Sequence, residues 1–175
     1  MQEGELNFDF SSAKQVEKLD EKGKMLPEGM KFVDFVVEEE RDLFLIEVKD
    51  PSCKAKGGDS KAEAAIQKQR EEFIKKIYKD DWIAQDLTPK ARDSYTFLHL
   101  MGRDTKPTVY VLLIGSDKLM LDPALLTAFK DRLLAKLCQE ADQPWVRQYV
   151  ADCLIVTENT WSIVFPNYPL VRLAS

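Results

Sequence analysis

The pattern of hydrophobic and polar positions is most informative in the first third of the chain. Two apolar runs, residues 32–37 and 43–48, are separated by five consecutive charged residues. Short runs rich in Val, Ile and Phe that are joined by a polar turn predict a β-hairpin. Both runs are apolar on both faces of the predicted strands, so we expect a sheet that is covered on both sides. Asp34, Glu47 and Lys49 are the exceptions to this apolar pattern.

The hairpin predicts where these three polar side chains lie. Side chains along a strand alternate between faces, so Glu47 and Lys49 share one face. If the turn lies between Glu40 and Arg41, Asp34 is directly opposite Glu47, with Cβ atoms roughly 4.5–5.5 Å apart. Two carboxylates that face each other in an apolar strand pair repel, and a divalent cation between them removes this penalty because hard cations prefer oxygen ligands. A register shifted by one residue would send one acid to the other face.

An acid on one strand, followed by acid-x-Lys on the next strand and then by a helix, resembles the motif of the PD-(D/E)XK phosphodiesterase superfamily. Asp34 is the first acid here, and Glu47-Val48-Lys49 follows it, while Val33 stands where many members have a proline. The resemblance covers roughly residues 10–115. It implies the restriction-endonuclease-like fold, an α/β domain with three layers (α/β/α) and a central mixed sheet. The alternative is a hairpin end that carries a solvated Glu–Lys pair and has no further function.

The resemblance also implies a role for each of these residues. Asp34 and Glu47, together with the carbonyl of Val48, would hold Mg²⁺ or Mn²⁺. Lys49 would orient or help deprotonate the attacking water and would stabilise the charge that develops in the transition state. The implied activity is metal-dependent hydrolysis of a phosphodiester.

Glu17, Asp20 and Gln69 are implicated by their places on predicted helices. In the family, a glutamate on the first helix often completes the metal shell, which implies Glu17, with Asp20 as the second choice. Both acids fit a solvated helix surface as well. Gln69, with Phe73 four residues later, is similar to a glutamine that points to the active site in the exonuclease branches. The alternative for Gln69 is a buried amide that is hydrogen-bonded to the backbone.

The rest of the chain predicts alternating helices and strands within one domain, residues 1–175. A continuous apolar run over residues 107–115 predicts a strand that is buried on both faces. Asp122-Pro123 predicts the start of a helix, with the acid as N-cap. The other predicted elements are helices over residues 12–22, 60–79 and 90–101, a connection over 82–89, a helical turn over 145–150, a hairpin from 153–157 and 161–165, and an extended tail over 166–169.

Composition narrows the class of protein. A chain of 175 residues with 45% hydrophobic and 31% charged residues is typical of a globular protein with a sizeable core. The acidic N-terminus and the lack of a long apolar run predict a cytoplasmic protein without a signal peptide or membrane partner. Its three cysteines are widely spaced, which favours reduced thiols over disulfides or a zinc site. His99, the single histidine, argues against hydrolases that depend on histidine and against most zinc enzymes.

Charge is unevenly distributed along the chain. The net charge of −5 excludes a protein that coats nucleic acid through bulk charge. Residues 49–79 are nevertheless rich in lysine, and Lys54, Lys56 and Lys61 follow the acidic hairpin closely enough to contact a DNA or RNA backbone. An ordinary surface loop and a helix face of mixed charge explain these lysines equally well.

Two functions from different classes follow. The first is a nuclease, a Mg²⁺- or Mn²⁺-dependent hydrolase that acts on DNA or RNA. The second is a non-catalytic interaction or nucleic-acid-binding domain that retains the nuclease fold, as a homodimer or as a subunit of a larger complex. An α/β enzyme acting on a nucleotide or sugar phosphate ranks last, because the chain has no glycine-rich phosphate loop.

Overall fold

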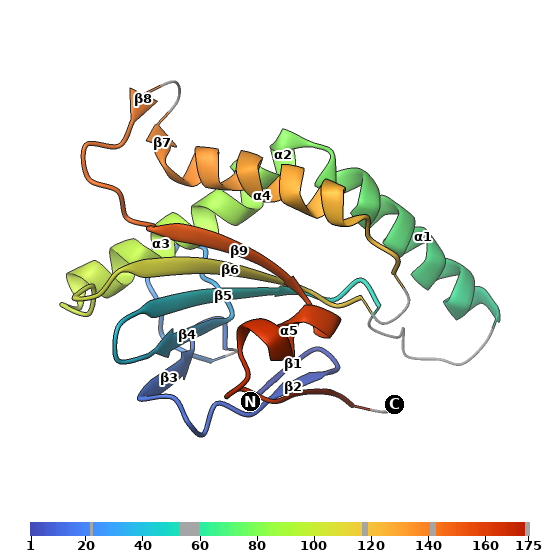
Figure 1. Ribbon diagram of the computed structural model, residues 1–175, viewed down its shortest axis with the longest axis horizontal. Helices are drawn as coiled ribbons and strands as arrows, with labels where there is room; N and C mark the ends of the chain where they lie inside the picture. Colours follow the sequence, from blue (N-terminus) through green and yellow to red (C-terminus); the bar gives the residue numbers. More distant parts are fainter. Residues whose placement is uncertain (22, 53–59, 117–118, 141–142, 174–175) are drawn as a thin grey trace.

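A mixed sheet of five strands lies at the centre of the molecule (Figure 1). The computed structural model describes residues 1–21, 23–52, 60–116, 119–140 and 143–173, without the side chains of residues 60–62 and 140. The strands, in their order across the sheet, are β3 (Gln15–Lys18), β4 (Phe35–Glu38), β5 (Leu43–Lys49), β6 (Thr108–Ile114) and β9 (Asp152–Thr157). β3, β4 and β5 pair antiparallel, whereas β5, β6 and β9 pair parallel. The predicted α/β class and mixed sheet are therefore confirmed.

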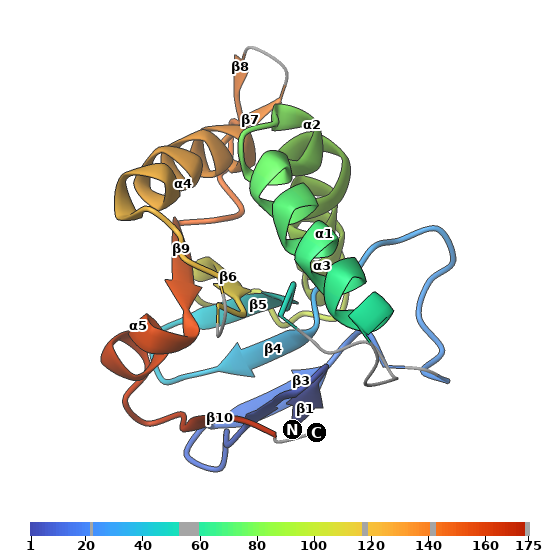
Figure 2. The same ribbon diagram turned by 90° about the vertical axis from the view of Figure 1, so that its right-hand side faces the viewer.

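Helices cover one face of this sheet (Figures 1 and 2). They are α1 (Ser60–Ile77), α2 (Asp80–Trp82), the π-helix η1 (Ile83–Leu87), α3 (Thr88–Leu100) and α4 (Pro123–Leu137). Their apolar side chains pack with Val36, Leu45 and Leu112 in one core. Asp122 caps α4, since its Oδ1 accepts a hydrogen bond from the Ala124 amide at 2.8 Å, as the sequence predicts. Across the described residues, no helix has the length and apolar character needed to cross a membrane.

A different kind of layer covers the other face. It consists of α5 (Glu158–Val164) and a small antiparallel sheet of β1 (Gln2–Glu3), β2 (Leu6–Phe8) and β10 (Leu170–Arg172), so the first and the last strand of the chain lie together on this side (Figures 1 and 2). Its aromatic side chains pack against Phe35, Val37 and Ile46 of the central sheet. The central sheet is thus covered on both sides, but the expected third layer of helices is mainly a second sheet. A short pair, β7 (Gln139–Glu140) and β8 (Gln143–Pro144), completes the strands.

The predicted hairpin register is confirmed. Phe35 pairs with Ile46 and Val37 with Phe44, which places the turn between Glu40 and Arg41. The Glu39 amide closes the turn by donating to the Asp42 carbonyl at 2.9 Å.

Two predictions near the N-terminal half were wrong. Residues 12–22 do not form a helix but contain β3, which pairs with the edge of β4. Pairing satisfies the open hydrogen-bonding groups of β4, and this outweighs the local capping signal at Ser12. Residues 82–89 are not a loop connection, because α2, η1 and α3 follow one another as helical backbone from Asp80 to Leu100.

Three predictions in the C-terminal part were also wrong. Residues 161–165 are not the second strand of a hairpin but belong mainly to α5, where Trp161 and Phe165, one helical turn apart, bury their rings against the sheet. Thr157 and Thr160 form the capping box that starts this helix. Residues 145–150 form bends without a helical turn, and residues 166–169 form a turn where an extended tail was expected.

Candidate functional site

The hairpin brings Asp34 and Glu47 to facing positions. Asp34 lies one step beyond the Phe35–Ile46 pair, in the position opposite Glu47. Both side chains point to the helix-covered face, since Val36 and Leu45, two residues away on each strand, belong to the core on that side. Asp34 is 5% exposed and Glu47 is 0% exposed. The structure therefore places two buried carboxyl groups side by side in an otherwise apolar strand pair, as the sequence predicts.

Hydrogen bonds fix the orientation of Asp34. Its Oδ2 accepts a hydrogen bond from the backbone amide of Val48 at 2.6 Å. Its own carbonyl accepts from the Leu19 amide at 2.9 Å, and the neighbouring Val33 amide donates to Ser94 Oγ at 3.0 Å. The start of β4 is thus hydrogen-bonded to three surrounding segments. These hydrogen bonds fix the backbone that carries Asp34 and one oxygen of its carboxyl group.

Two lysines contact the Glu47 carboxylate. Lys49 Nζ lies 2.8 Å from Glu47 Oε1, and Lys90 Nζ lies 2.8 Å from Oε1 and 3.0 Å from Oε2. A fully buried carboxylate is stable only when it is paired, because removing it from water costs several kcal/mol. Both cations belong to the site, since Lys49 follows Glu47 on β5 and Lys90 projects from the first turn of α3.

Asp86 connects the site to the π-helix. Its Oδ2 lies 3.1 Å from Lys49 Nζ and accepts a hydrogen bond from Trp82 Nε1 at 3.1 Å. π-Helical turns often occur at functional sites. Asp86 and Lys90 are four residues apart, which places them on one side of a helix. Sequence reasoning missed both residues: it assigned Asp86 to a connection, and it placed Lys90 at the start of a predicted helix without relating it to the site.

The electrostatics of the site separate its acids. Burial, with a further contribution from Glu47, raises the pKa of Asp34 to about 7. Burial also raises the pKa of Glu47, although the two lysines oppose the change. Burial would raise the pKa of Asp86, but the charge of Lys49 outweighs it and the net shift is downward. Both buried acids of the pair therefore hold a proton more tightly than a free carboxyl group does, and the pKa of Asp34 lies near neutral pH.

Lys49 keeps its positive charge. Burial acts to lower the pKa of Lys49, but Glu47 and Asp86 more than offset it, so the pKa lies above its ordinary value. The side chain is 27% exposed, which makes it the part of the acid–acid–lysine set that solvent reaches. Lys49 is thus a fixed cation at the mouth of a buried acidic pair.

The donor atoms suit a hard divalent cation with several water ligands. Within the described ranges, no group of three or more His, Cys, Asp or Glu side chains is arranged to hold a metal ion. Asp34 and Glu47 supply two carboxylates, and Mg²⁺ commonly binds through one or two carboxylates while keeping several waters. An ion here would have to displace the lysine ammonium groups from Glu47. The residues therefore fit a metal site with few ligands from the protein. In such a site the ion and the lysine ammonium groups compete for the carboxylate of Glu47.

Glu17 and Asp20 were the two acids predicted to complete the metal shell. Glu17 lies on β3, not on a helix, and its carboxylate pairs with Lys24 and with Arg103, the latter at 2.6 Å. Both cations lower its pKa against the opposing effect of burial. The structure does not bring Glu17 into contact with Asp34 or Glu47. Asp20, the second choice, is 63% exposed at the side chain and lies 3.9 Å from Lys90.

Gln69 lies on α1 beside the site. It is exposed, so the alternative of a buried amide satisfied by the backbone is wrong. Gln69 and Lys49 line the same open pocket, which has a volume of about 240 Å³ and is also lined by Asp50, Pro51, Glu72, Phe73 and Lys76. Lys54 and Lys56 lie outside the described residues. Lys61 lies in the first turn of α1, and its side chain is not among those described.

His99 and the described cysteines lie apart from the acidic pair. His99 is 54% exposed at the side chain, and its Nδ1 lies 2.6 Å from Asp104 Oδ2, apart from the acidic pair. Cys138 and Cys153 are free thiols, and Cys53 lies outside the described residues.

Comparison of the chain with protein-family models, with curated proteins and with solved structures found no match. The class of protein is therefore defined only at the level of an α/β fold with a mixed sheet. A function has to be inferred from the chemistry of the site, because fold class by itself does not determine activity.

Proposed function

We propose that this protein is a metal-dependent phosphodiesterase, a nuclease that hydrolyses DNA or RNA on a restriction-endonuclease-like fold. The observation that carries the proposal is the pair of buried, facing carboxyl groups of Asp34 and Glu47 with Lys49 on the same face. Burying two acids side by side is unfavourable unless a cation joins them. Buried acids with perturbed pKa values are typical of catalytic and ligand-binding sites.

Each residue has a distinct role in this proposal. Asp34 and Glu47, with the Val48 carbonyl, would hold Mg²⁺ or Mn²⁺, which when bound polarises a phosphoryl oxygen and lowers the pKa of a bound water. Lys49 stabilises the negative charge that develops on the phosphate and orients the attacking water. The raised pKa of Lys49 favours this electrostatic role over that of a general base. Asp86 holds the ammonium group of Lys49 in place.

The surface beside Lys49 is where substrate would enter. Asp34 and Glu47 are buried, whereas Lys49 borders the 240 Å³ pocket that Gln69 and Lys76 also line. In this arrangement Gln69 positions the scissile phosphate by hydrogen bonding. Lys54, Lys56 and Lys61 would contact the phosphate backbone outside the pocket, a contribution that is strongly salt-dependent.

The contact of two lysines with Glu47 favours a second candidate, a non-catalytic interaction domain. Lys49 and Lys90 compensate the charge of Glu47 without any metal ion. An ion-pair network of this kind can be part of the folded core without binding any ligand. In that case the protein binds a partner or nucleic acid through its surface, and the acidic pair only stabilises the hairpin.

Cleavage assays test the proposal. Labelled single- and double-stranded DNA and RNA are incubated with Mg²⁺, with Mn²⁺ and with chelator, using wild type, Lys49→Ala and Glu47→Gln. Lys130→Ala is the matched control, because Lys130 forms an ion pair with Asp152 outside the site. We expect metal-dependent cleavage by wild type and the control, and its loss in both site variants. Cleavage that persists in Lys49→Ala would reject the assignment.

Metal binding without turnover separates the two candidates. A ligand that binds only the folded state raises the melting temperature, and at a given concentration a tighter ligand raises it more. Under the nuclease proposal, Mg²⁺ or Mn²⁺ raises the melting temperature of wild type and not that of Glu47→Gln. If the ions change the melting temperature of neither wild type nor Glu47→Gln, the interaction domain is favoured.

A further inference from the structure

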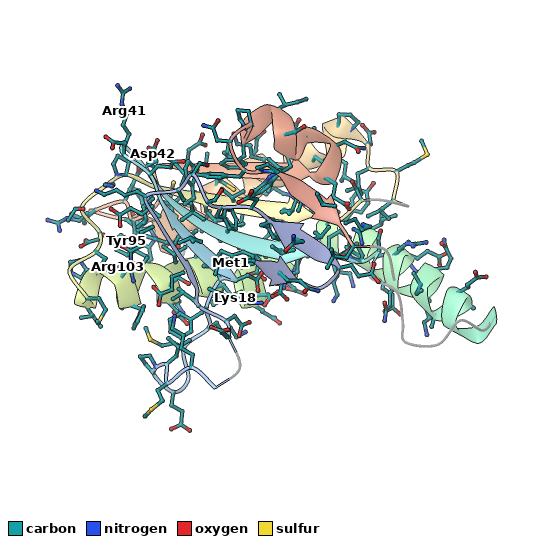
Figure 3. The ribbon with its side chains drawn as sticks, turned by 90° about the horizontal axis from the view of Figure 1, so that it is seen from below. Met1, Lys18, Arg41, Asp42, Tyr95 and Arg103 are labelled. Carbon is teal, nitrogen blue, oxygen red and sulfur yellow. The ribbon has the colours of Figure 1, made fainter. Side chains whose placement is uncertain are left out.

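A second pocket lies at the other end of β5 and on the opposite face of the sheet from Glu47. It has a volume of about 330 Å³ and is lined by residues 39–42 of the β4–β5 turn, by Phe44 and by residues 164–168 at the end of α5. This volume lies at the lower end of the roughly 300–1,000 Å³ of ligand pockets. Figure 3 shows Arg41 at this turn pointing away from the rest of the molecule.

The inner part of this pocket is aromatic. The rings of Phe44 and Phe165 are 5.3 Å apart and nearly perpendicular, and the rings of Phe165 and Tyr168 are 6.2 Å apart. Phe165 is 6% exposed and Tyr168 is 3% exposed, so both are held firmly by the core. Rigid aromatic rings at the base of a pocket attract cations, and guanidinium groups most often.

The rim of the pocket is acidic. Glu39, Glu40 and Asp42 form no ion pair within the part of the chain that the structure describes. The neighbouring Glu38 differs, since Lys106 Nζ lies 2.8 Å and Lys14 Nζ 3.7 Å from its Oε1. Three carboxylates of the turn are therefore left without a cation beside an aromatic base. Arg41 is the single basic residue among those that line the pocket.

Tyr168 provides an independent indication of a ligand. Its hydroxyl is buried and has no hydrogen-bond partner among the described residues. A buried hydroxyl without a partner is unfavourable by roughly 1–3 kcal/mol. Tyr168 is among the residues that line the pocket, and a ligand that reached this buried oxygen with a donor would satisfy it.

We propose that this pocket binds an arginine side chain from a partner protein. The guanidinium group combines a flat face that stacks on aromatic rings with a fork of donors that matches carboxylates. In the pocket it packs against Phe44 and Phe165, donates to the carboxylates of Glu40 and Asp42, and supplies a donor to the Tyr168 hydroxyl. A lysine ammonium is strongly hydrated and offers no planar face, so it fits the same surroundings less well. The pocket is separate from the phosphodiesterase site, and this inference does not depend on that proposal.

Peptide titration observed by NMR tests this inference. The full chain, labelled with ¹⁵N, is titrated with acetyl-Gly-Arg-Gly-amide, and separately with the same peptide carrying citrulline or lysine. Citrulline has the shape of arginine without its charge. The matched variants are Glu40→Gln/Asp42→Asn at the pocket and Glu21→Gln/Glu28→Gln at exposed acids elsewhere, each of which removes two negative charges.

The arginine peptide should shift the amide signals of residues 39–44 and 164–168 in a saturable manner. We expect binding to weaken about tenfold or more in Glu40→Gln/Asp42→Asn, since charge-assisted hydrogen bonds are lost, and to remain unchanged in the control variant. An absence of saturable shifts, or equal shifts with citrulline, would overturn the proposal. A lysine peptide that binds as tightly as the arginine peptide would overturn the assignment of arginine.

Discussion

Lys90 Nζ donates to both carboxylate oxygens of Glu47, at 2.8 and 3.0 Å. This contact joins the first turn of α3 to the middle of the central sheet, and it encloses a carboxylate that is 0% exposed. A metal ion bound to Glu47 would have to compete with this ammonium group for the same oxygens. Substitution of Lys90 therefore distinguishes the two interpretations of the site: a structural ion pair, or a metal site in which Lys90 competes with the ion.

Lys90→Met should lower stability and strengthen the response to metal. Lys49 remains to pair with Glu47, so we expect the free energy of unfolding to fall by about 2 kcal/mol, less than when a buried charge loses all partners. With one competing cation removed, Mg²⁺ should raise the melting temperature more in Lys90→Met than in wild type. Lys106→Met is the control, because Lys106 is similarly buried but pairs with Glu38. An equal or smaller Mg²⁺ effect in Lys90→Met would argue against metal binding at Glu47.

The raised pKa of Asp34 predicts a specific pH dependence of stability. Its pKa is about 7 in the folded protein, against an ordinary value of 3.8. The folded state therefore binds this proton more tightly than the unfolded state, and stability falls as the pH rises from about 4 to about 7. The loss attributable to Asp34 is at most about 4 kcal/mol.

Urea unfolding of wild type and Asp34→Asn at several pH values, in the presence of chelator, isolates this effect. The difference in unfolding free energy between the two proteins should move in favour of Asp34→Asn as the pH rises through this interval, and should become constant above it. Saturating Mg²⁺ should reduce the change, because a nearby cation favours the ionised carboxylate. A difference that does not depend on pH would contradict the assigned pKa.

Asp86→Asn should impair catalysis by releasing Lys49, under the nuclease proposal. Asparagine can still accept the hydrogen bond from Trp82 Nε1, but it loses the charge that holds the ammonium group. We expect kcat to fall about tenfold with little change in KM, since the interaction lost is one that orients a charge for the transition state. Asp86→Glu should recover part of the rate. If Asp86→Asn changes KM alone, or changes neither constant, Asp86 does not position Lys49.

The centre of the site could be predicted from sequence because it depends on local pattern. Alternating polar and apolar positions fix which face each side chain occupies, and a short charged turn fixes the register, so Asp34 could be placed opposite Glu47. The helix over Ser60–Ile77 and the strand over Thr108–Ile114 follow from equally local signals. These elements carry the part of the fold that surrounds the acidic pair.

The remaining features depend on contacts between distant segments. Lys90 and Asp86 reach the site only because the helical backbone is continuous from Asp80 to Leu100 and packs across β5. The apolar run that starts at Trp161 fits a short strand and a short helix equally well, and the capping box at Thr157 decides for the helix. Glu17 was misplaced because pairing with β4 outweighed a local helix signal.

Arg172→Met should be strongly destabilising. The Arg172 guanidinium donates to Asp50 at 2.9 and 3.0 Å, to Glu158 at 2.5 and 3.0 Å and to Glu5 at 3.2 Å. Without it, three partly buried carboxylates repel one another, and we expect a loss of about 3 kcal/mol in urea unfolding. Arg172→Lys should lose less, because it keeps the charge but not the planar fork. Arg41→Met, at an exposed turn, should change stability by no more than about 0.5 kcal/mol. Equal effects at the two arginines would contradict this role.

Gly115→Ala tests how tightly this carboxylate cluster is packed against the end of β6. A Cβ atom at residue 115 would lie 2.3 Å from Asp50 Oδ1 and 3.0 Å from an Arg172 guanidinium nitrogen. Asp50 cannot turn aside easily, since Arg172 holds both of its oxygens. We expect Gly115→Ala to lower the free energy of unfolding by about 1–3 kcal/mol.

A double-mutant cycle distinguishes this clash from a backbone effect. In Arg172→Met the Asp50 side chain keeps its hydrogen bond from the Ser52 amide but loses both contacts with Arg172, so it can rotate more easily and adding Gly115→Ala should cost less there than in wild type. The Gly115 amide also donates to the Lys49 carbonyl at 2.8 Å, which connects this packing to the proposed catalytic lysine. Strictly additive effects in urea unfolding would show that Asp50 and Arg172 do not impose the requirement for glycine.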